Sequence, residues 1–213
     1  MEGKIIKFLD ILPVGERLKK TGNFFDSIAS TYDSAIIPIV ENAGCPWNRY
    51  IEELDSVVEE MQDKVIVDIG CGTSFPIGTL LPKNSIYLGV DVSVSMLKCA
   101  SQLLSDNMNA SLFNIDASRI PLEDNSVGVV LAIFFFNSVE DYVPDVREIK
   151  RILAPQSIFY AVFLEKNEAL DKISIVKPID RERIESILSY FTGRKYIFES
   201  RCGNLRFCKV RFY

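Results

Sequence analysis

The ten residues Val65-Ile66-Val67-Asp68-Ile69-Gly70-Cys71-Gly72-Thr73-Ser74 join a short apolar run to a glycine-rich turn. The first five are mostly β-branched and predict a buried strand over 65–69. The two glycines allow the backbone to turn sharply and to approach a ligand closely. A helix predicted over 75–81 would offer unpaired N–H groups at its start. This order predicts a binding loop at the carboxyl edge of a sheet.

Strands and helices alternate after this loop. The apolar patterns predict strands over 86–90, 111–115, 127–134 and 157–164, and helices over 93–104, 142–153 and 180–191. Such alternation requires parallel strands joined by crossovers, with helices on both faces of the sheet. Two further strands, over 195–201 and 205–212, are joined by a Gly203-Asn204 turn and should be antiparallel. We therefore expect an α/β three-layer sandwich with a mostly parallel, seven-stranded sheet and one antiparallel strand near the C-terminus.

The first 64 residues lack this alternation and are helical in pattern. Helices are predicted over 4–12 and 23–32, and a third opens at Pro46, whereas Pro38 interrupts the apolar patch over 36–40. No linker separates this part from the remainder of the chain. We expect residues 1–64 to form a helical cap or lid on residues 65–213, which would form one compact core.

Composition narrows the possible functions. The 213 residues are 48% hydrophobic and 25% charged, which is typical of a globular protein, and the net charge of −5 argues against a nucleic-acid partner. The chain has no histidine, so a Ser-His or Cys-His nucleophile pair and a His-ligated metal are excluded. Chemistry must come from other side chains or from a bound cofactor, and we expect no metal.

The cysteines and the apolar stretches bear on the compartment. Five cysteines without a CxxC pair predict free thiols in a reducing compartment. The longest apolar stretch, around 127–136, is about half of a membrane span. These observations predict a cytoplasmic protein without a membrane span, and no feature predicts an oligomeric state.

Two acidic residues follow the next strands along the chain. Asp91 ends the strand over 86–90, about 20 residues beyond the loop, where a carboxylate can accept hydrogen bonds from ribose hydroxyls. Asp116 ends the third strand beside Ala117 and could accept from an adenine amino group. Each acid alone is equally explained as a helix cap or a solvated loop residue. Together with the loop they predict a nucleoside site at one sheet edge.

Two cofactor classes share this outline. A pyrophosphate binder favours G-x-G-x-x-G, whose third glycine allows close helix packing, but Phe75 occupies that position. The negative charge of Asp68 would also oppose a pyrophosphate, whereas it suits a ligand with sulfonium and ammonium groups. The electrostatics therefore favour S-adenosylmethionine over a nicotinamide dinucleotide.

The same segments resemble a known family. Residues 65–73, 89–97, 116–126 and 148–155 are similar to successive motifs of class I S-adenosylmethionine-dependent methyltransferases. The likeness is strongest to the type-11 group, which includes ubiquinone/menaquinone methyltransferases, and Phe25–Asp33 resembles the helix that closes over the cofactor there. The resemblance extends over roughly residues 24–210 and implies a Rossmann-like fold.

The resemblance also implies a set of cofactor-binding residues: Tyr32, Asp68, Gly70, Cys71, Gly72, Asp91, Val92, Met96, Asp116, Ala117 and Phe134. The loop would surround the methionine portion, and Asp91 would bind the ribose. Val92 and Met96 would flank the adenine, whose edge would meet Asp116 and Ala117. Tyr32 could reach the methionine carboxylate and the backbone at Phe134 the amino group. Core packing explains Met96 and Tyr32 equally well.

Departures from the family pattern concern the acceptor. Ser74 replaces a third loop glycine, Ser138 stands near a position where the family often has histidine, and the usual Pro-Gly-Gly turn is replaced at 155–157. Tyr32, Glu140, Asp141 and Tyr142 are the nearest candidates for a general base, and none is favoured over a surface or capping role. No catalytic residue is therefore predicted.

Methyl transfer to a small-molecule acceptor, with S-adenosylhomocysteine as product, is the function that the resemblance implies. The alternatives are a non-catalytic S-adenosylmethionine-binding sensor or partner subunit, a protein or RNA methyltransferase, and a nicotinamide dehydrogenase.

Overall fold

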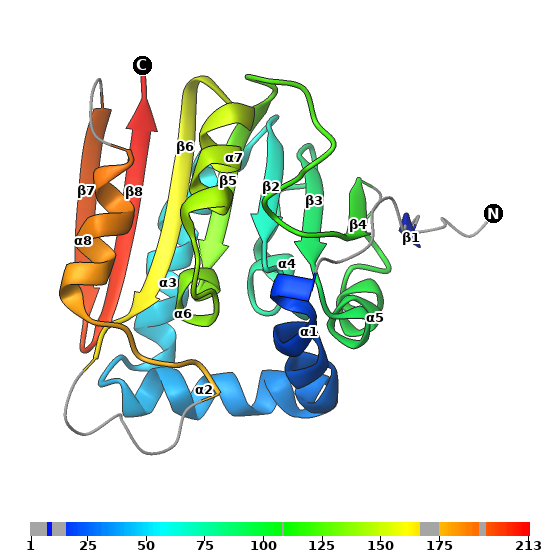
Figure 1. The fold of residues 1–213 in the computed structure, drawn as a ribbon, viewed down its shortest axis with the longest axis vertical. Coiled ribbons are helices and arrows are strands. Elements are labelled where there is room, and N and C mark those ends of the chain that lie inside the picture. The colour runs from blue at the N-terminus through cyan, green and yellow to red at the C-terminus, as the bar shows by residue number, and fades with distance from the viewer. Residues whose placement is uncertain (1–7, 10–15, 108, 167–174, 192–194) are drawn as a thin grey trace.

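The centre of the molecule is one twisted sheet. A computed structural model describes residues 8–9, 16–107, 109–166, 175–191 and 195–213 (Figure 1). The strands are β1 (Phe8–Leu9), β2 (Val65–Ile69), β3 (Ile86–Asp91), β4 (Ala110–Asn114), β5 (Val127–Ile133), β6 (Leu153–Leu164), β7 (Lys195–Cys202) and β8 (Leu205–Phe212). They are hydrogen-bonded in the order β1-β4-β3-β2-β5-β6-β8-β7. The short edge strand β1 makes the sheet eight-stranded.

Only β8 runs against the other strands of this sheet. The pairs from β1 to β6 are parallel, and β8 is antiparallel to both β6 and β7. The predicted mostly parallel sheet with one reversed strand near the C-terminus is therefore confirmed. The tight turn at Gly203 and Asn204 connects β7 to β8 as expected.

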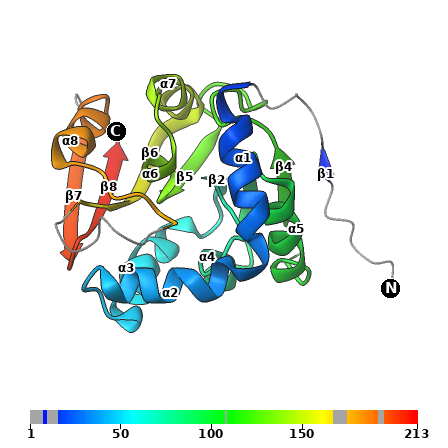
Figure 2. The ribbon, with the colours of Figure 1, turned by 60° about the horizontal axis from the view of Figure 1, so that its bottom comes forward.

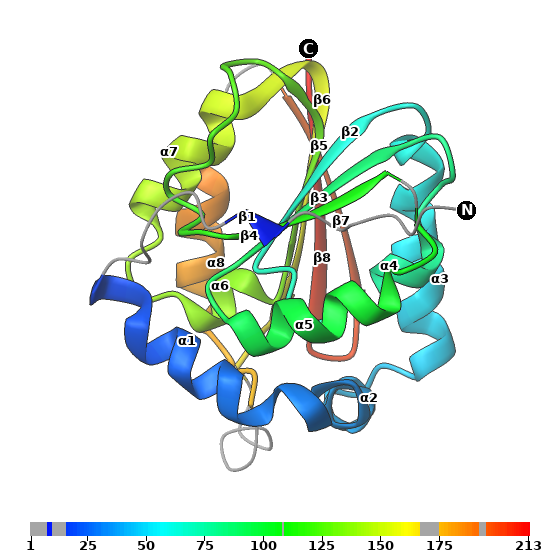
Figure 3. The ribbon, with the colours of Figure 1, turned by 90° about the vertical axis from the view of Figure 1, so that its right-hand side faces the viewer.

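Helices cover both faces of the sheet, which Figure 3 shows edge-on. They are α1 (Glu16–Ile28), α2 (Tyr32–Asn42), α3 (Trp47–Val58), α4 (Ile77–Leu80), α5 (Val94–Leu103), α6 (Phe135–Ser138), α7 (Val143–Ile152) and α8 (Arg181–Ser189), with 3-10 turns at Ala29–Thr31 and Glu59–Met61. No helix in the described part of the chain is both long and apolar enough to cross a membrane.

Alternation along the strands divides the core in two. Ile66 of β2 packs with buried residues of α2, α3 and α5, whereas the next residue, Val67, packs with those of α6, α7 and α8. Successive side chains of a strand point to opposite faces, so a strand covered on both sides is apolar throughout. The two clusters are the interfaces of a three-layer sandwich, as predicted.

The helices α1 and α2 lie across one end of this sandwich. Figures 1 and 2 show them at the end where β2, β3, β5 and β6 terminate. The helix predicted over 23–32 begins earlier, at Glu16, and ends at Ile28, before a 3-10 turn. The patch over 36–40 lies within α2, which continues through Pro38. Its buried residues Ile36, Ile39 and Val40 explain this, because burial of an apolar face outweighs one missing backbone donor.

The N-terminal end of the chain differs from the prediction. Phe8 and Leu9 form β1, which pairs with β4 in parallel, so a helix over 4–12 is wrong at these two residues. Pairing with the exposed edge of β4 satisfies backbone groups that the edge would leave open. The other residues of that predicted helix lie outside the described part of the chain.

The prediction that all five cysteines are free is also wrong. Cys45, in the turn between α2 and α3, forms a disulfide with Cys202 at the end of β7, 157 residues away. The other three, Cys71, Cys99 and Cys208, are free thiols. The N–H of Asn204 donates to the carbonyl of Ala43 at 2.7 Å beside the disulfide. The α2–α3 turn is thus attached to the β7–β8 turn covalently and through the backbone.

Candidate functional site

The glycine loop after β2 requires the left-handed backbone region. Gly70 and Gly72 have φ values of +65° and +53°. A Cβ on Gly70 would lie 2.6 Å from the ring of Phe135, so no side chain fits there. A Cβ on Gly72 would meet nothing within 4 Å. The loop is therefore closely packed on one side and open on the other, as a ligand-binding loop must be.

Ser74 takes the place of a third glycine in the same loop. Its φ is +61°, a region that non-glycine residues adopt at some cost. The Ser74 N–H donates to the Cys71 carbonyl at 2.7 Å, and its hydroxyl lies 3.0 Å from the hydroxyl of Tyr87. These bonds stabilise a conformation that glycine would adopt freely, which explains how the chain tolerates this departure.

Asp91 connects β3 to the loop. Its carboxylate accepts hydrogen bonds from the N–H of Gly72 at 2.9 Å and from the N–H of Ser93 at 2.8 Å. Burial raises the pKa of Asp91 to about 6, although the backbone hydrogen bonds act to lower it. Asp91 therefore holds the loop in shape as well as lining the cavity described below.

Asp68 is a buried carboxyl group within β2, with 2% of its surface exposed. It accepts a hydrogen bond from the hydroxyl of Tyr87 at 2.7 Å. Burial raises the pKa of Asp68 to about 7; the bond from Tyr87 acts to lower it, and the nearby charge of Asp91 raises it. A cation that entered beside Asp68 would favour its ionised form.

A cavity with two lobes lies between the carboxyl ends of the strands and the helices α1 and α2. The larger lobe has a volume of about 610 Å³ and the smaller about 380 Å³. Both are lined by the same five residues: Tyr32, Gly70, Gly72, Ile133 and Phe134. The larger lobe is mainly apolar, whereas the smaller reaches Asp68 and Tyr50. A long ligand with a nucleoside at one end and a polar group at the other fits this division.

The structure brings ten of the eleven predicted site residues to this cavity. The larger lobe is lined by Tyr32, Gly70, Gly72, Asp91, Val92, Met96, Ala117 and Phe134, and the smaller adds Asp68 and Cys71. Asp116 is not among the described lining residues, although its neighbours Ile115 and Ala117 are. Its carboxylate accepts a hydrogen bond from the N–H of Ser118 at 2.9 Å.

Several lining residues were not predicted from the sequence. From the cap, Leu18 and Thr21 line the larger lobe and Tyr50 the smaller, and Ser138 and Val139 follow β5. Tyr50 belongs to an apolar helical stripe, and only its hydroxyl could have indicated a ligand. The position of Ser138 next to the family's histidine position was a usable signal.

Two carboxylates of the cap bind the loops that border the cavity. Asp26 of α1 accepts from the Ser93 hydroxyl at 2.7 Å and from the Ser95 N–H at 2.8 Å. Asp33 of α2 accepts from the Thr73 hydroxyl at 2.6 Å. The cap is thus attached beside the glycine loop and at the start of α5.

Of the four candidate general bases, only Tyr32 is among the described residues that line the cavity. Glu140 and Asp141 are exposed, and neither is among the described residues that line the cavity. The Tyr142 hydroxyl lies 2.8 Å from that of Ser186 on α8. Tyr32 does line both lobes, and burial followed by the charges of Asp91 and Asp33 raises its pKa. Its hydroxyl is therefore neutral near pH 7.

Comparison with known proteins agrees with this geometry. Residues 67–161 match the type-11 methyltransferase family, described as a methyltransferase domain. The demethylmenaquinone methyltransferase of Staphylococcus saprophyticus is 30% identical over 137 residues, 62% of this chain and 56% of that protein. The demethylmenaquinone methyltransferase of Listeria monocytogenes is 26% identical over 142 residues, 64% of this chain and 59% of that protein. The chain spans less than two thirds of the length of these relatives.

Solved structures share the fold at low identity. A SAM dependent methyltransferase from Aquifex aeolicus matches with a TM-score of 0.66 and 16% identity, over 87% of this chain and 97% of that chain. The [4+2]-cyclase SpnF matches with a TM-score of 0.70 and 15% identity, over 96% of this chain and 99% of that chain. The fold is therefore the Rossmann-like fold of class I methyltransferases.

Fold and family match together place the chain in a class of proteins, the class I methyltransferases. Within that class, residues 67–161 match the type-11 group that the sequence motifs indicated. S-adenosylmethionine is the cofactor that this domain implies.

The described residues fit this cofactor. The hydroxyl of Tyr50 in the smaller lobe is buried and has no hydrogen-bond partner among them, and the carboxyl group of Asp68 lies in the same lobe. These two groups match the polar amino-acid tail of S-adenosylmethionine. Val92, Met96 and Ala117 offer an apolar slot for a base in the larger lobe.

Proposed function

We propose that this chain transfers the methyl group of S-adenosylmethionine to a small-molecule acceptor. The observation that carries the proposal is the two-lobed cavity, in which apolar walls adjoin Asp91 at one end and Asp68 lies at the other. Carboxyl groups at both positions suit ribose hydroxyls and an ammonium group, respectively. A pyrophosphate, which is negatively charged, would instead be repelled by the carboxylates of Asp68 and Asp91.

Each part of the site would contribute to binding and alignment. Asp91 would orient the ribose while its hydrogen bond to Gly72 keeps the loop in place. Val92 and Met96 would hold the base, and Asp68 would accept from the ammonium group. When bound, S-adenosylmethionine supplies an already activated methyl group for an in-line displacement. The remaining task of the protein is alignment of the acceptor and exclusion of water.

The cap would form the lid over this reaction. We propose that residues 1–64 serve as cap and residues 65–213 as the methyltransferase core, because α1 and α2 cross the carboxyl ends of the strands. Asp26 and Asp33 would hold the lid closed through their bonds to Ser93 and Thr73.

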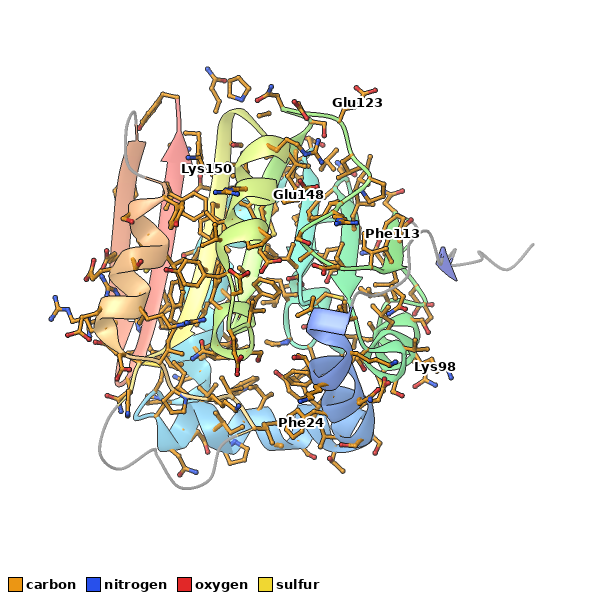
Figure 4. All side chains as sticks on the ribbon, in the orientation of Figure 1. Phe24, Lys98, Phe113, Glu123, Glu148 and Lys150 are labelled. Carbon is orange, nitrogen blue, oxygen red and sulfur yellow. A yellow bond between two sulfur atoms is a disulfide. The ribbon has the colours of Figure 1, made fainter. Side chains whose placement is uncertain are left out.

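The lining favours a largely apolar acceptor. Phe25 lines the larger lobe and packs at 5.2 Å between ring centroids against Phe24, which is 46% exposed. Figure 4 shows Phe24 extending from α1 at the end of the sheet where the cap lies. An apolar small molecule could enter along these rings. The names of the curated relatives, demethylmenaquinone methyltransferases, are in keeping with such an acceptor.

One alternative has specific support. The fold neighbour SpnF is named a cyclase, so this fold is not confined to methyl transfer, and a non-catalytic S-adenosylmethionine-binding role is compatible with the absence of a placed base. A protein or RNA acceptor is less favoured, because the net charge of −5 opposes RNA.

The experiment that tests the proposal measures S-adenosylhomocysteine release against a panel of quinol, phenol, amine, thiol, peptide and RNA acceptors. We expect turnover with at least one apolar small molecule and none with RNA. Tight S-adenosylmethionine binding without turnover on any acceptor would favour the non-catalytic alternative.

A further inference from the structure

Tyr50 is a core residue whose ring packs within the fold but whose hydroxyl group has no part in that packing. It lies on α3, is 0% exposed, and lines the smaller lobe with Asp68 and Tyr32. Its hydroxyl oxygen is buried without a hydrogen-bond partner among the described residues. Burial, and then the nearby Tyr32 and Asp68, raise its pKa, so the group remains a neutral O–H. A buried hydroxyl without a partner is costly and rare in folded proteins, which points to a ligand.

The ring of Tyr50 is fixed by its surroundings. It is stacked on Phe134 with 6.2 Å between centroids and 9° between planes, and it also contacts Trp47 and Phe207 at 5.2 and 6.0 Å. The hydroxyl therefore cannot swing to another partner. The ring that carries this hydroxyl is thus held at the wall of the smaller lobe.

The backbone that carries Tyr50 is fixed as well. Glu53, one turn further along α3, accepts hydrogen bonds from the side chains of Arg49 and Ser200 at 2.7 and 2.6 Å. The bond from Ser200 attaches α3 to β7.

The described lining of the smaller lobe offers no cationic side chain that could bind a negatively charged group. None of its described lining residues is lysine or arginine, and the same holds for the larger lobe. In the proposed function Asp68 accepts from the ammonium group of the cofactor. The α-carboxylate of the same tail then needs neutral donors, and a phenol O–H is a strong neutral donor to a carboxylate. Tyr32, on the wall shared by both lobes, offers a second phenol O–H, whereas Tyr50 lines only the smaller lobe, together with Asp68.

We infer that the Tyr50 hydroxyl donates a hydrogen bond to the α-carboxylate of the cofactor's amino-acid tail and thereby selects S-adenosyl amino acids over tail-less nucleosides. This rests on the proposed function. It makes Tyr50 a specificity-determining residue on the sheet-facing side of α3, outside the glycine loop and the strand ends.

Calorimetric titration of Tyr50→Phe tests this with three ligands. These are S-adenosylhomocysteine, its decarboxylated analogue, and 5′-methylthioadenosine, which lacks the whole tail. We expect the variant to bind S-adenosylhomocysteine at least about tenfold more weakly, the loss for one hydrogen bond to a charged group. Binding of the two ligands without a carboxylate should stay within about twofold of wild type.

Tyr160→Phe is the matched control, because it removes a buried hydroxyl that is bonded to protein and lies outside the described lining. All three affinities should be unchanged in this variant. Its melting temperature should fall, whereas that of Tyr50→Phe should hold or rise, since only the latter removes an unpartnered group.

The outcomes separate the two claims. Equal losses for all three ligands, or an unchanged affinity for S-adenosylhomocysteine, would overturn the role of Tyr50 while leaving the proposed function intact. A loss that extends to the decarboxylated analogue would overturn the assignment to the carboxylate. If the wild-type protein binds none of the three, the proposed function fails and the inference fails with it.

Discussion

Raising the pH from 6 to 8 should strengthen the binding of S-adenosylhomocysteine, and Asp68 should account for the change. In the free protein, burial raises the pKa of Asp68 to about 7, so the carboxyl group is half protonated at neutral pH. An ammonium group beside it favours the ionised form and lowers its pKa in the complex. Binding therefore releases a proton, and by linkage the affinity must rise with pH.

The magnitude follows from one titrating group. With a free-state pKa of about 7 and a much lower value in the complex, the apparent Kd is multiplied by about 11 at pH 6 and about 1.1 at pH 8. The affinity should thus increase about tenfold across this range. Tyr50 and Tyr87 face the same group, but burial raises their pKa values and keeps them neutral throughout. Asp91, with a pKa of about 6, is half protonated at the lower end of the range and can change the affinity by at most about twofold.

The assay is calorimetric titration at pH 6, 7 and 8 in buffers of different ionisation enthalpy, which also counts the released proton. Asp68→Asn should give a nearly flat profile, because the amide does not titrate. 5′-Methylthioadenosine should give a flat profile with wild-type protein, because it has no ammonium group. A tenfold slope that persists in Asp68→Asn would refute the assignment of this proton to Asp68.

Three further predictions concern the same network and the attachment of the cap. Tyr87→Phe removes the hydrogen bond that lowers the pKa of Asp68, so the midpoint of its pH profile should move to higher pH in the same titrations. Gly203→Ala should lower the free energy of unfolding by about 2–4 kcal/mol in urea, because φ is +59° and a Cβ would lie 2.1 Å from a carbonyl oxygen of the α2–α3 turn. Cys45→Ser should lower it by up to about 5 kcal/mol under oxidising conditions, the chain-entropy value for the 157-residue separation from Cys202.

Controls are available within the chain. Cys99→Ser removes a free, partly buried thiol and should leave the urea midpoint nearly unchanged. If wild type and Cys45→Ser unfold at the same urea concentration without reductant, the disulfide does not contribute as described. An Ala at Gly203 with wild-type stability would contradict the close approach of the two turns.

Apart from the short helix α6, the elements from β2 onward could be predicted to within a few residues. The apolar run over 65–69 is short and is followed by a glycine turn, which is typical of a buried strand. In the helix over 143–152 the apolar residues recur with a period of about 3.6 residues. The glycines at 70 and 72 are required by positive φ, which is a local property and is visible in sequence.

The cap was harder to predict because its helices are stabilised by distant parts of the chain. α2 continues through Pro38, since Ile36, Ile39 and Val40 are buried against the sandwich. The disulfide joins cysteines 157 residues apart, and an odd cysteine count gives no indication of the pairing. Neither feature depends on local sequence.

The candidate site was partly predictable, because some of its residues depend on local sequence and others on packing between distant elements. Asp68 and Asp91 could be predicted because they lie at the carboxyl ends of two strands, and parallel pairing brings these ends together. Tyr50 enters the cavity because of the rotation of α3 about its axis, set by packing against Phe134 and Phe207. Asp116 lies next to two lining residues, yet the local turn directs its carboxylate to the N–H of Ser118.

The most direct test of the central claim is calorimetric titration of the purified chain with S-adenosylmethionine and, separately, with NADH. One molecule of S-adenosylmethionine should bind per chain, and Gly70→Val, which would clash with the ring of Phe135, should abolish binding. NADH should not bind. Tight binding of NADH without binding of S-adenosylmethionine would contradict the account.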